Sequence, residues 1–392
     1  MIVCQEYKDG VVVKRKKKNF IVVRVGTITH PMTQSVIRML LDMGYKVSVV
    51  TTKNNDDLNN LFHNKIKIRE IDVDYTKPAN IIVKFFRLFI IRLELWKAIN
   101  ELIDEDSILW VGHNITIKHL GNRLCKYDYI LHLNELNENI AYWPRFPIFK
   151  LNAEKIGNGA KSVIVPEYNR AYIVQAMWNL KTLPKIMPNK PYLEKSLPKN
   201  ATINSSKEAK ELINKLDGKK IILYQGAISR ERKIDSFVRA VSELGDDYAF
   251  LIMSKDLNII NFVLPQNCYT LHHINAPEHL EVTSHAFLGV LSYIPEMTSN
   301  SKLNSLYCAP NKLFEYSMFQ IPMIGNDIPG LRTVFSQYGC GECCSYDEQQ
   351  IVKVIKLIED NYSVYCENSK RLYQSVDNYE TLRKIVQEIE KE

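Results

Sequence analysis

Residues 310–327 read PNKLFEYSMFQIPMIGND, and this stretch contains a helix start, a helix and a buried strand in direct succession. Pro310 and Asn311 are typical of helix starts, so we expect the helix to begin near Lys312. The apolar run at 321–325 is typical of a strand that is buried on both faces. A helix followed by a buried strand is the repeating unit of a doubly wound parallel sheet. The stretch therefore favours an α/β fold.

The start of this helix has two charged residues that lie on the same face, Lys312 and Glu315. Backbone N–H groups are unpaired at a helix start, and the helix dipole is positive there, so this end attracts phosphate. Lys312 would add a point charge, and Glu315 could accept hydrogen bonds from two hydroxyls of a ribose. The alternative is an exposed ion pair between residues three apart, worth only about 0.2–0.5 kcal/mol.

The composition is that of an ordinary globular protein. The chain has 392 residues, which predicts two domains, with 46% apolar and 24% charged residues. A net charge of +7 could favour phosphate-bearing ligands or an anionic membrane, but does not by itself indicate nucleic acid. Of the eight cysteines only Cys340, Cys343 and Cys344 cluster, and no second pair completes a zinc motif, so we expect reduced thiols and no metal.

We expect a cytoplasmic protein. The first residues, MIVCQEYKDGVVVKRKKKN, do not have the order of charges and apolar residues of a signal peptide. The longest apolar run, Ile81 to Trp96, contains Lys84, Arg87 and Arg92, which make it too charged to span a bilayer.

Short apolar runs alternate with helical patterns along the whole chain. The predicted strands of the first series are 19–26, 46–50, 107–114, 127–135 and 160–167. The predicted strands of the second series are 219–228, 248–254, 268–274, 286–294 and 321–327. The proline- and lysine-rich segment from Leu183 to Asn200 looks like a linker between them. We therefore predict two Rossmann-like doubly wound domains facing a central cleft.

A second charged stretch, YQGAISRERK at 224–233, closes one predicted strand. Gly226 would let the backbone approach a ligand closely, and Arg230, Arg232 and Lys233 could hold a diphosphate. Taken alone, the stretch is equally typical of a loop whose charges are solvated.

Together the two stretches resemble the donor-binding half of the GT-B glycosyltransferases, specifically the large family 4 (group 1). Members have a Tyr-Gln-Gly strand end, a basic residue shortly after it, and an Asn-Lys-Leu-Phe-Glu-Tyr helix. The stretches THPMTQSVIRMLLDMGYKVSVV and MPNKPY are similar to the family's first helix with its second strand and to the end of its first domain. The resemblance covers the chain from Asn19 to about Glu342. It implies an acceptor-binding domain at 1–190, a donor-binding domain at 191–374, and a C-terminal helix at 375–392 that packs back on the first domain.

The resemblance also implies roles for single residues. Glu315 would bind the ribose of a nucleotide sugar. The diphosphate would be held by Gly226, Arg232, Lys233 and the helix start at Asn311 and Lys312, with Arg230 as a further cation. The backbone at His273 and Ile274 would border the base. No metal is required where basic side chains and a helix start supply the positive charge.

The sequence departs from the family pattern at two places. Many members have an earlier glutamate, near the transferred sugar, where Tyr307 stands. Many also have Asp-Ser-His-Glu after a strand of the first domain, and this chain has HLNE, so Asn134 replaces the histidine and Glu135 is kept. Glu135 could orient or deprotonate the acceptor hydroxyl. His113, at the end of the neighbouring predicted strand, is a second candidate, and a polar loop without catalytic role is the alternative.

Two basic segments raise the question of a membrane. They are Lys14 to Lys18 and the run from Ile81 to Trp96, in which aromatic and basic residues alternate. An amphipathic basic helix can lie in the headgroup region of an anionic membrane, which would suit an acceptor linked to polyprenyl diphosphate. A helix that faces the core and has a solvated basic side is the alternative.

We therefore predict a glycosyltransferase that moves a sugar from a UDP-linked donor to a hydroxyl of a lipid-linked or growing glycan, as in capsule, O-antigen or exopolysaccharide assembly. Retention of configuration is implied by the resemblance alone. A GT-B-fold UDP-sugar epimerase and an inactive binding subunit of a transferase complex remain alternatives. A dinucleotide-dependent dehydrogenase is disfavoured because only Gly26 follows the first strand, and separate basic clusters disfavour nucleic acid.

Overall fold

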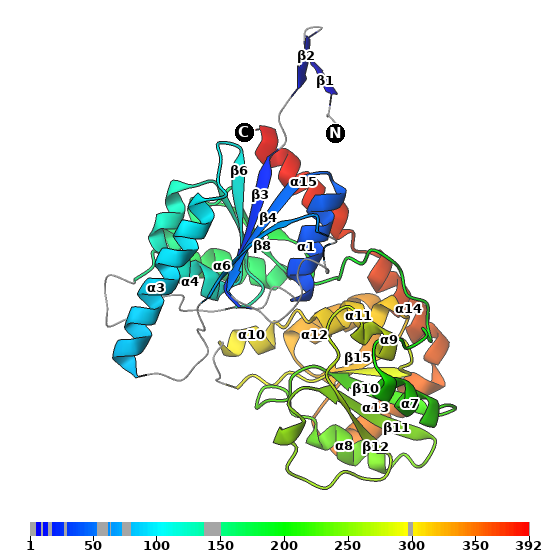
Figure 1. The fold of residues 1–392 in the computed structure, drawn as a ribbon. Helices are drawn as coiled ribbons and strands as arrows, with labels where there is room; N and C mark the ends of the chain where they lie inside the picture. The colour runs from blue at the N-terminus through cyan, green and yellow to red at the C-terminus, as the bar shows by residue number, and fades with distance from the viewer. Residues whose placement is uncertain are drawn as a thin grey trace. The chain divides into compact units, whose positions relative to one another are not determined.

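The structure is a computed structural model. It describes residues 5–8, 11–14, 18–26, 30–52, 62, 64–72, 80–136, 150–296 and 301–391. The chain divides into two compact units, of which unit 1 comprises Met1–Met187 with Asn378–Glu392 and unit 2 comprises Pro188–Asp377. Figure 1 shows the elements of both units.

Unit 1 is built on a parallel sheet of seven strands in the order β5-β4-β3-β6-β7-β8-β9. The strands are β3 (Asn19–Arg24), β4 (Lys46–Thr52), β5 (Lys67–Ile71), β6 (Ser107–Gly112), β7 (Tyr129–His132), β8 (Ser162–Val165) and β9 (Lys185–Ile186). A separate antiparallel hairpin consists of β1 (Gln5–Lys8) and β2 (Val11–Lys14). The reversal of strand order on either side of β3 is the doubly wound pattern.

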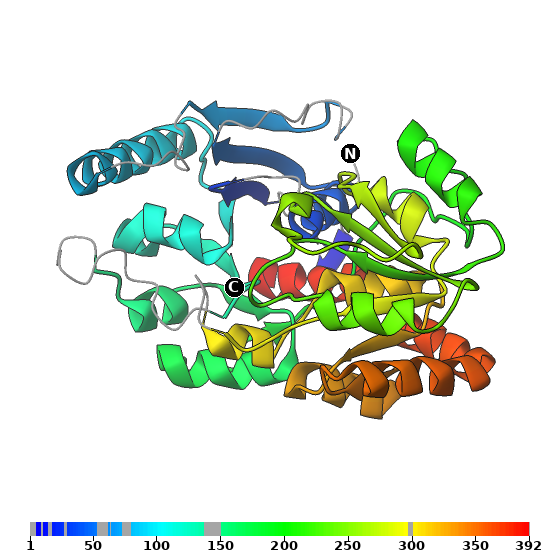
Figure 2. The same ribbon diagram turned by 90° about the horizontal axis from the view of Figure 1, so that it is seen from below.

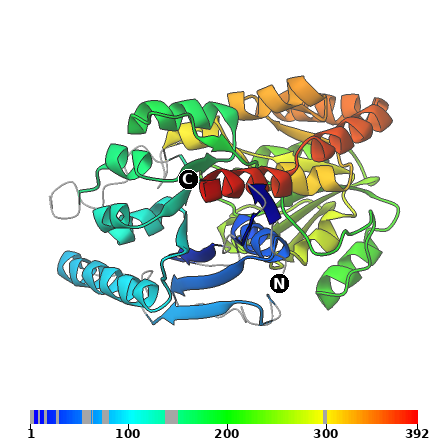
Figure 3. The same cartoon turned by 90° about the horizontal axis from the view of Figure 1, so that it is seen from above.

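The helices of unit 1 connect these strands as crossovers. They are α1 (Pro31–Asp42), α3 (Ile81–Asn100), α4 (Asn114–Leu120), the 3₁₀ helix η1 (Gly121–Lys126), α5 (Ala153–Asn158) and α6 (Tyr168–Trp178). The last helix of the chain, α15 (Asn378–Lys391), also belongs to unit 1 and is the red helix in Figure 3. Its Leu382, Ile385 and Ile389 are buried, and its Glu388 pairs with Lys185 of β9 at 2.8 Å.

Unit 2 is built on a parallel sheet of six strands in the order β12-β11-β10-β13-β14-β15. The strands are β10 (Lys220–Gln225), β11 (Tyr248–Ser254), β12 (Cys268–His272), β13 (Leu288–Leu291), β14 (Met323–Asn326) and β15 (Gly341–Cys344). The helices are α7 (Lys207–Lys215), α8 (Asp235–Ser242), η3 (Leu257–Ile259), α9 (His279–Thr283), α10 (Lys302–Leu306), α11 (Asn311–Met318), α12 (Pro329–Tyr338), α13 (Glu348–Asp360) and α14 (Tyr362–Gln374).

Alternation along β10 shows how the sheet of unit 2 separates two cores. Ile221 and Leu223 pack in one core with residues of α7, α9, α11, α12 and α14. Ile222 and Tyr224, which point to the other face, pack with residues of α8 and α13. Figure 1 shows α9 and α11 on one side of this sheet and α8 on the other. The predicted α/β class with two Rossmann-like domains is confirmed.

The cysteines of the described residues form no disulfide, and several are buried in these cores. All seven cysteines of the described residues are free. Burial raises the pKa of Cys340, Cys343 and Cys344 to about 12. Among the described residues, no group of three or more His, Cys, Asp or Glu side chains is placed to hold a metal ion.

Candidate functional site

The helix α11 is held in place by its apolar side. Leu313, Phe314 and Tyr316 lie in the core of unit 2, and the Tyr316 hydroxyl donates to the backbone carbonyl of Leu223 at 3.0 Å. The Tyr316 ring occupies the space above Gly289, where a Cβ atom would come within 2.3 Å of the ring. The first turn of α11 is thereby fixed at the end of β10, at the carboxyl edge of the sheet.

Lys312 and Glu315 are both buried, with exposed fractions of 8% and 4%. Pro310 precedes the helix in an extended conformation, and no side chain of the described residues caps the helix start. The interpretation of Lys312 and Glu315 as an exposed ion pair is therefore wrong. Burial of two ionisable side chains at an uncapped helix start is costly for a purely structural role.

The Lys312 ammonium has no hydrogen-bond partner among the described residues. Its Nζ lies 4.6 Å from the centroid of the Tyr224 ring and 5.3 Å from that of Tyr293, within cation–π distance of both. Burial, with the charge of Arg232 as a further cause, lowers the pKa of Lys312 to about 7, against the opposing effect of Glu315. Such an ammonium would gain most from an anionic ligand.

Gly226 lies directly beside this ammonium. Its φ of +115° is a conformation that glycine adopts readily and other residues rarely do. A Cβ atom at this position would lie 3.7 Å from Nζ of Lys312. The backbone after β10 therefore leaves the space beside Lys312 free of side-chain atoms from this position.

Both oxygens of the Glu315 carboxylate have partners inside unit 2. Gln225 Nε2 donates to Oε2 at 2.7 Å, and His279 Nε2 lies 3.4 Å from Oε1. Burial alone would raise the pKa of Glu315, but His279, Gln225 and Lys312 together bring this pKa below its ordinary value. The carboxylate is therefore ionised at neutral pH, so both of its oxygens act as hydrogen-bond acceptors.

The three predicted cations after β10 differ in placement. The half-buried Arg232 has its guanidinium carbon 5.5 Å from the centroid of the Tyr293 ring, which also contacts Lys312. Lys233 pairs with Glu296 at 3.0 Å, and Arg230 is exposed. The structure thus brings Arg232 to Lys312, whereas the described contacts do not bring Arg230 or Lys233 there.

The predicted base-binding segment borders a hollow of about 500 Å³. Its lining includes His272, His273, Ile274, Asn275 and Glu278, with the segment before α7 opposite them. Burial lowers the pKa of His273, and the charge of His279 acts in the same direction. His279 therefore lies near both this hollow and Glu315.

In unit 1, the predicted residues lie at the carboxyl ends of β6 and β7. His113 has a φ of +76°, and its Nδ1 accepts the backbone N–H of Ile115 at 3.3 Å, so it caps α4. Asn134 is buried, and its backbone carbonyl accepts a hydrogen bond from Arg170 Nη1 at 2.7 Å. Its side-chain Oδ1 has no hydrogen-bond partner in the described part of the chain. Glu135 is half-buried, and its backbone carbonyl accepts from Asn114 Nδ2 at 3.0 Å.

The buried polar residues around these positions were not predicted from the sequence. Arg24, at the end of β3, is 5% exposed and bonds Thr33 at 3.1 Å. Burial and the charge of Arg24 lower the pKa of His113 to about 4 and that of His132 to about 3, and they lower the pKa of His30 as well. An arginine inside an otherwise apolar strand was the sequence signal for this cluster.

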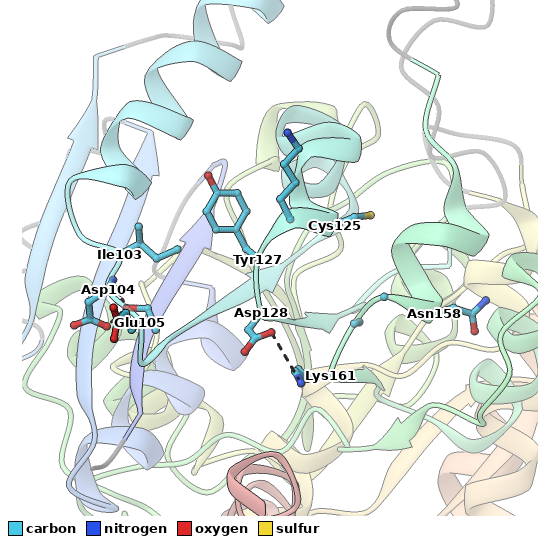
Figure 4. A pocket seen from close by; sticks show the side chains of 12 residues that line it. Ile103, Asp104, Glu105, Cys125, Tyr127, Asp128, Asn158 and Lys161 are labelled. Atoms are coloured by element: carbon cyan, nitrogen blue, oxygen red, sulfur yellow. Dashed lines mark hydrogen bonds and ion pairs between the residues drawn. The ribbon is translucent and has the colours of Figure 1, made fainter. Parts of the chain in front are cut away.

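A further hollow, of about 650 Å³, lies at the opposite edge of the sheet in unit 1 (Figure 4). Its lining comes from the segments that precede β6, β7 and β8, and Asp128 and Lys161 pair across it at 4.0 Å. In doubly wound folds ligands bind at the carboxyl ends of the strands, so this hollow is at the wrong edge for the site described above.

The helix α3 presents apolar side chains to solvent. Ile82, Phe86 and Leu93 share one face and are 64%, 59% and 52% exposed. Arg92 instead donates to the carbonyls of Lys118 and His119 at the end of α4. The alternative, a helix that faces the core and has a solvated basic side, holds for the buried Ile91, Leu95 and Ile99, but the solvated side of α3 is apolar as well as basic. Figure 2 shows α3 at the periphery of unit 1.

None of the helices in the described residues has an apolar stretch long enough to cross a membrane. Of the other predicted membrane segment, Lys14 to Lys18, residues 15–17 lie outside the described residues.

Comparisons with known proteins agree with this geometry at the level of the fold. No protein-family model matches the sequence, and no curated protein is significantly similar to it by sequence. Sucrose-phosphate synthase from Thermosynechococcus elongatus is similar in structure, with a TM-score of 0.66 and 15% identity over 95% of this chain and 98% of that one. WaaG, a glycosyltransferase involved in lipopolysaccharide biosynthesis, has a TM-score of 0.64 and 11% identity over 94% and 99%.

HepE from Anabaena, solved in complex with UDP, has a TM-score of 0.60 and 10% identity over 95% of this chain and 98% of that one. At such identities the similarity concerns the fold alone. The chain has the GT-B fold of these glycosyltransferases.

Proposed function

We propose that the chain is a glycosyltransferase that takes a sugar from a UDP-linked donor and transfers it to a hydroxyl of a lipid-linked or growing glycan. The observation that carries the proposal is that two charged groups lie within one helical turn. They are the Lys312 ammonium, which has no hydrogen-bond partner among the described residues, and the ionised Glu315 carboxylate. A nucleoside diphosphate has a matching pair of groups, a dianionic diphosphate next to a ribose diol. HepE and a trehalose-6-phosphate protein from E. coli, both of this fold, were solved with UDP and UDP-2-fluoro glucose.

In this mechanism unit 2 binds the donor. Lys312, Arg232 and the backbone N–H groups at the start of α11 hold the diphosphate, and Glu315 accepts the ribose hydroxyls. The hollow beside His273 and Ile274 receives the base. When the sugar–phosphate bond breaks, negative charge grows on the departing diphosphate, and these fixed positive groups stabilise it.

Unit 1 supplies the acceptor side. Glu135 orients the acceptor hydroxyl and takes its proton as the new bond forms. Because the neighbouring imidazoles have pKa values of about 3 to 4, they stay neutral at pH 7 and act as hydrogen-bonding groups rather than as bases. Attack on the face from which the diphosphate departs would retain the anomeric configuration.

The exposed face of α3 supports the setting of surface polysaccharide assembly at the inner side of a membrane. A row of exposed aromatic and aliphatic side chains can enter the headgroup region, and Lys97 continues the same face. An acceptor linked to polyprenyl diphosphate would be found there.

A panel of UDP-, GDP-, ADP- and TDP-linked sugars tests the proposal by thermal shift. The true donor should raise the Tm of the wild-type chain by several degrees, and Glu315→Gln should lose this rise while keeping the Tm of the free protein. Glu367→Gln, at an exposed ion pair with Lys370, is the matched control and should keep the rise. The absence of a shift with every nucleotide sugar would overturn the proposal.

One alternative has support from particular residues. Tyr307 and Asn134 stand where the resembling family has a glutamate and a histidine, which would fit an inactive binding subunit. Such a subunit would bind UDP but release none from a UDP-sugar, so UDP release during incubation distinguishes the two.

A further inference from the structure

Two residues of the helix α9 contact Glu315 or its hydrogen-bond partner Gln225. His279, the first residue of α9, has its Nε2 3.4 Å from Glu315 Oε1. Thr283, one turn later, has its hydroxyl 2.7 Å from Oε1 of Gln225, the residue that donates to Glu315 Oε2 at 2.7 Å. One short helix therefore acts on both oxygens of the carboxylate, directly on one and through Gln225 on the other.

This arrangement fixes the orientation of the Gln225 side chain. Because the Thr283 hydroxyl donates to the amide oxygen, the amide nitrogen must point to Glu315. An ionised carboxylate has about four acceptor positions, and Gln225 and His279 use two of them. The remaining positions suit two adjacent hydroxyls of one ribose.

His279 is not a histidine that the core satisfies. Its residue is 8% exposed, and its Nδ1 is buried without a hydrogen-bond partner among the described residues. The polar contact described for its ring is the one to Glu315. This contact is also the first of the influences that bring the pKa of Glu315 below its ordinary value against the effect of burial.

The far side of α9 is anchored independently of Glu315. Glu281 Oε2 accepts the backbone N–H groups of Asn204 and Ser205 at 2.8 and 2.9 Å and the Ser205 hydroxyl at 2.7 Å. Ser205 also lines the hollow beside His273. The backbone of α9, from which His279 projects, is therefore held against the segment before α7.

We propose that His279 is a positioning residue of the nucleotide site, which holds the Glu315 carboxylate ionised and correctly oriented for the two ribose hydroxyls of the donor. This inference rests on the proposed function, because it assumes that Glu315 binds a ribose. His279 touches Glu315 rather than the reacting atoms, so its effect should depend on the ribose hydroxyls and not on the diphosphate.

Calorimetric titrations of the full chain with UDP and with 2′,3′-dideoxyuridine diphosphate test this dependence. His279→Ala should weaken UDP binding about tenfold, the effect of one hydrogen bond to a charged group. It should change the affinity for the dideoxy nucleotide by less than about twofold, because that nucleotide does not use Glu315. His279→Gln, whose amide nitrogen can reach Glu315, should recover most of the UDP affinity.

His285→Gln is the matched control. This histidine follows α9 closely, but its Nε2 lies 2.8 Å from the Ala201 carbonyl, away from Glu315, so its replacement should leave both affinities unchanged. Equal weakening of both nucleotides by His279→Ala, or no weakening of UDP, would overturn the proposal.

A measurement without ligand separates this inference from the proposed function. In the free protein, ¹³C NMR of the glutamate carboxyls should show a higher pKa of Glu315 in His279→Ala than in wild type, because a favourable contact of the ionised form is lost. An unchanged pKa would overturn the role of His279. Failure of the wild-type chain to bind any nucleoside diphosphate would overturn the proposed function, and with it the ribose part of this inference.

Discussion

The carboxyl edges of the two sheets have different electrostatic character. In unit 2 an ionised carboxylate, Glu315, and a buried ammonium, Lys312, which has no hydrogen-bond partner in the described part of the chain, occupy one helical turn. In unit 1 the imidazoles of His113 and His132 are kept neutral by burial and by the charge of Arg24. The first edge has a titratable ammonium and a carboxylate, which suit a ligand with an anionic and a hydroxylated part, and the second has neutral imidazoles. We propose that the edge of unit 2 binds the donor and that the edge of unit 1 activates the acceptor.

The largest expected effect tests the edge of unit 1. Glu135→Gln should lower turnover of the preferred nucleotide sugar by about 10²–10⁴-fold, the usual contribution of a general base, and should leave UDP affinity unchanged. Turnover is measured as UDP release and affinity by calorimetry. Glu154→Gln, in α5, is the control and should retain turnover. A parallel loss of UDP affinity in Glu135→Gln would contradict the division of roles.

The next effect tests the edge of unit 2. Lys312→Met should weaken UDP binding by about 100-fold, because a charge-assisted contact to phosphate is lost. The exposed Lys302→Met should bind UDP like wild type. If both variants bind equally, Lys312 is not a phosphate ligand.

The same substitution, Lys312→Met, should weaken UDP binding but stabilise the fold. Since the pKa of Lys312 is about 7 in the folded chain and 10.5 ordinarily, the unfolded chain holds more protons between these values, and the free energy of unfolding rises with pH across this window. Lys312→Met should remove this rise and be more stable than wild type at pH 7. Urea unfolding of both proteins at pH 7 and pH 9.5 measures the difference, and identical pH slopes would show that the ammonium is not strained by burial.

A smaller effect concerns α3. Replacing Phe86 and Leu93 by serine should weaken binding to vesicles that contain phosphatidylglycerol by about tenfold or more, because these side chains no longer enter the lipid. The control pair is Leu357→Ser with Val364→Ser, which are 45% and 59% exposed in unit 2. Vesicle sedimentation measures the binding of both double variants. If both lose vesicle binding to the same extent, α3 is not a specific membrane-binding face.

The smallest effect concerns the stability that ion pairs at the surface contribute to each unit. Hydrogen bonds from Lys220, Tyr248 and Lys356 outweigh the effect of burial and lower the pKa of Glu359 to about 2. The resulting stability is present above the ordinary glutamate pKa of 4.5 and is lost as pH falls toward 2. Glu359→Gln should therefore cost about 1 kcal/mol at pH 7 and nothing near pH 2. Glu101→Gln, at the exposed pair with Arg69 in unit 1, should change stability by less than about 0.5 kcal/mol in urea unfolding.

The sequence predicted best where the needed residues are contiguous. The helix start at Pro310 and the strand that follows it were expected within one or two residues of α11 and β14. Nine of the ten predicted strands contain an observed strand, and the tenth, 46–50, matches β4, which continues to Thr52. Five observed strands were not predicted. The strands β1 and β2 form the short hairpin outside the main sheet, and β9 has only two residues. The strand β5 reads KIREI, in which charged residues predominate, and β15 reads GECC, which has no strand pattern.

The residues that act through tertiary contacts could not be predicted. His279 meets Glu315, and His132 meets Arg24, only after strands far apart in the sequence pair within a sheet. The burial of Lys312 also could not be predicted, because its spacing from Glu315 is equally typical of an exposed ion pair. This burial is the main cause of the low pKa of Lys312.

The most direct test of the central claim follows the Lys312 ammonium by NMR of ¹³C-labelled lysine side chains, during a pH titration with and without UDP. The account predicts a pKa of about 7 in the free protein, and a clear upward shift when UDP binds, because the diphosphate stabilises the charged form. Binding of UDP that leaves the Lys312 resonance and its pKa unchanged would contradict the account.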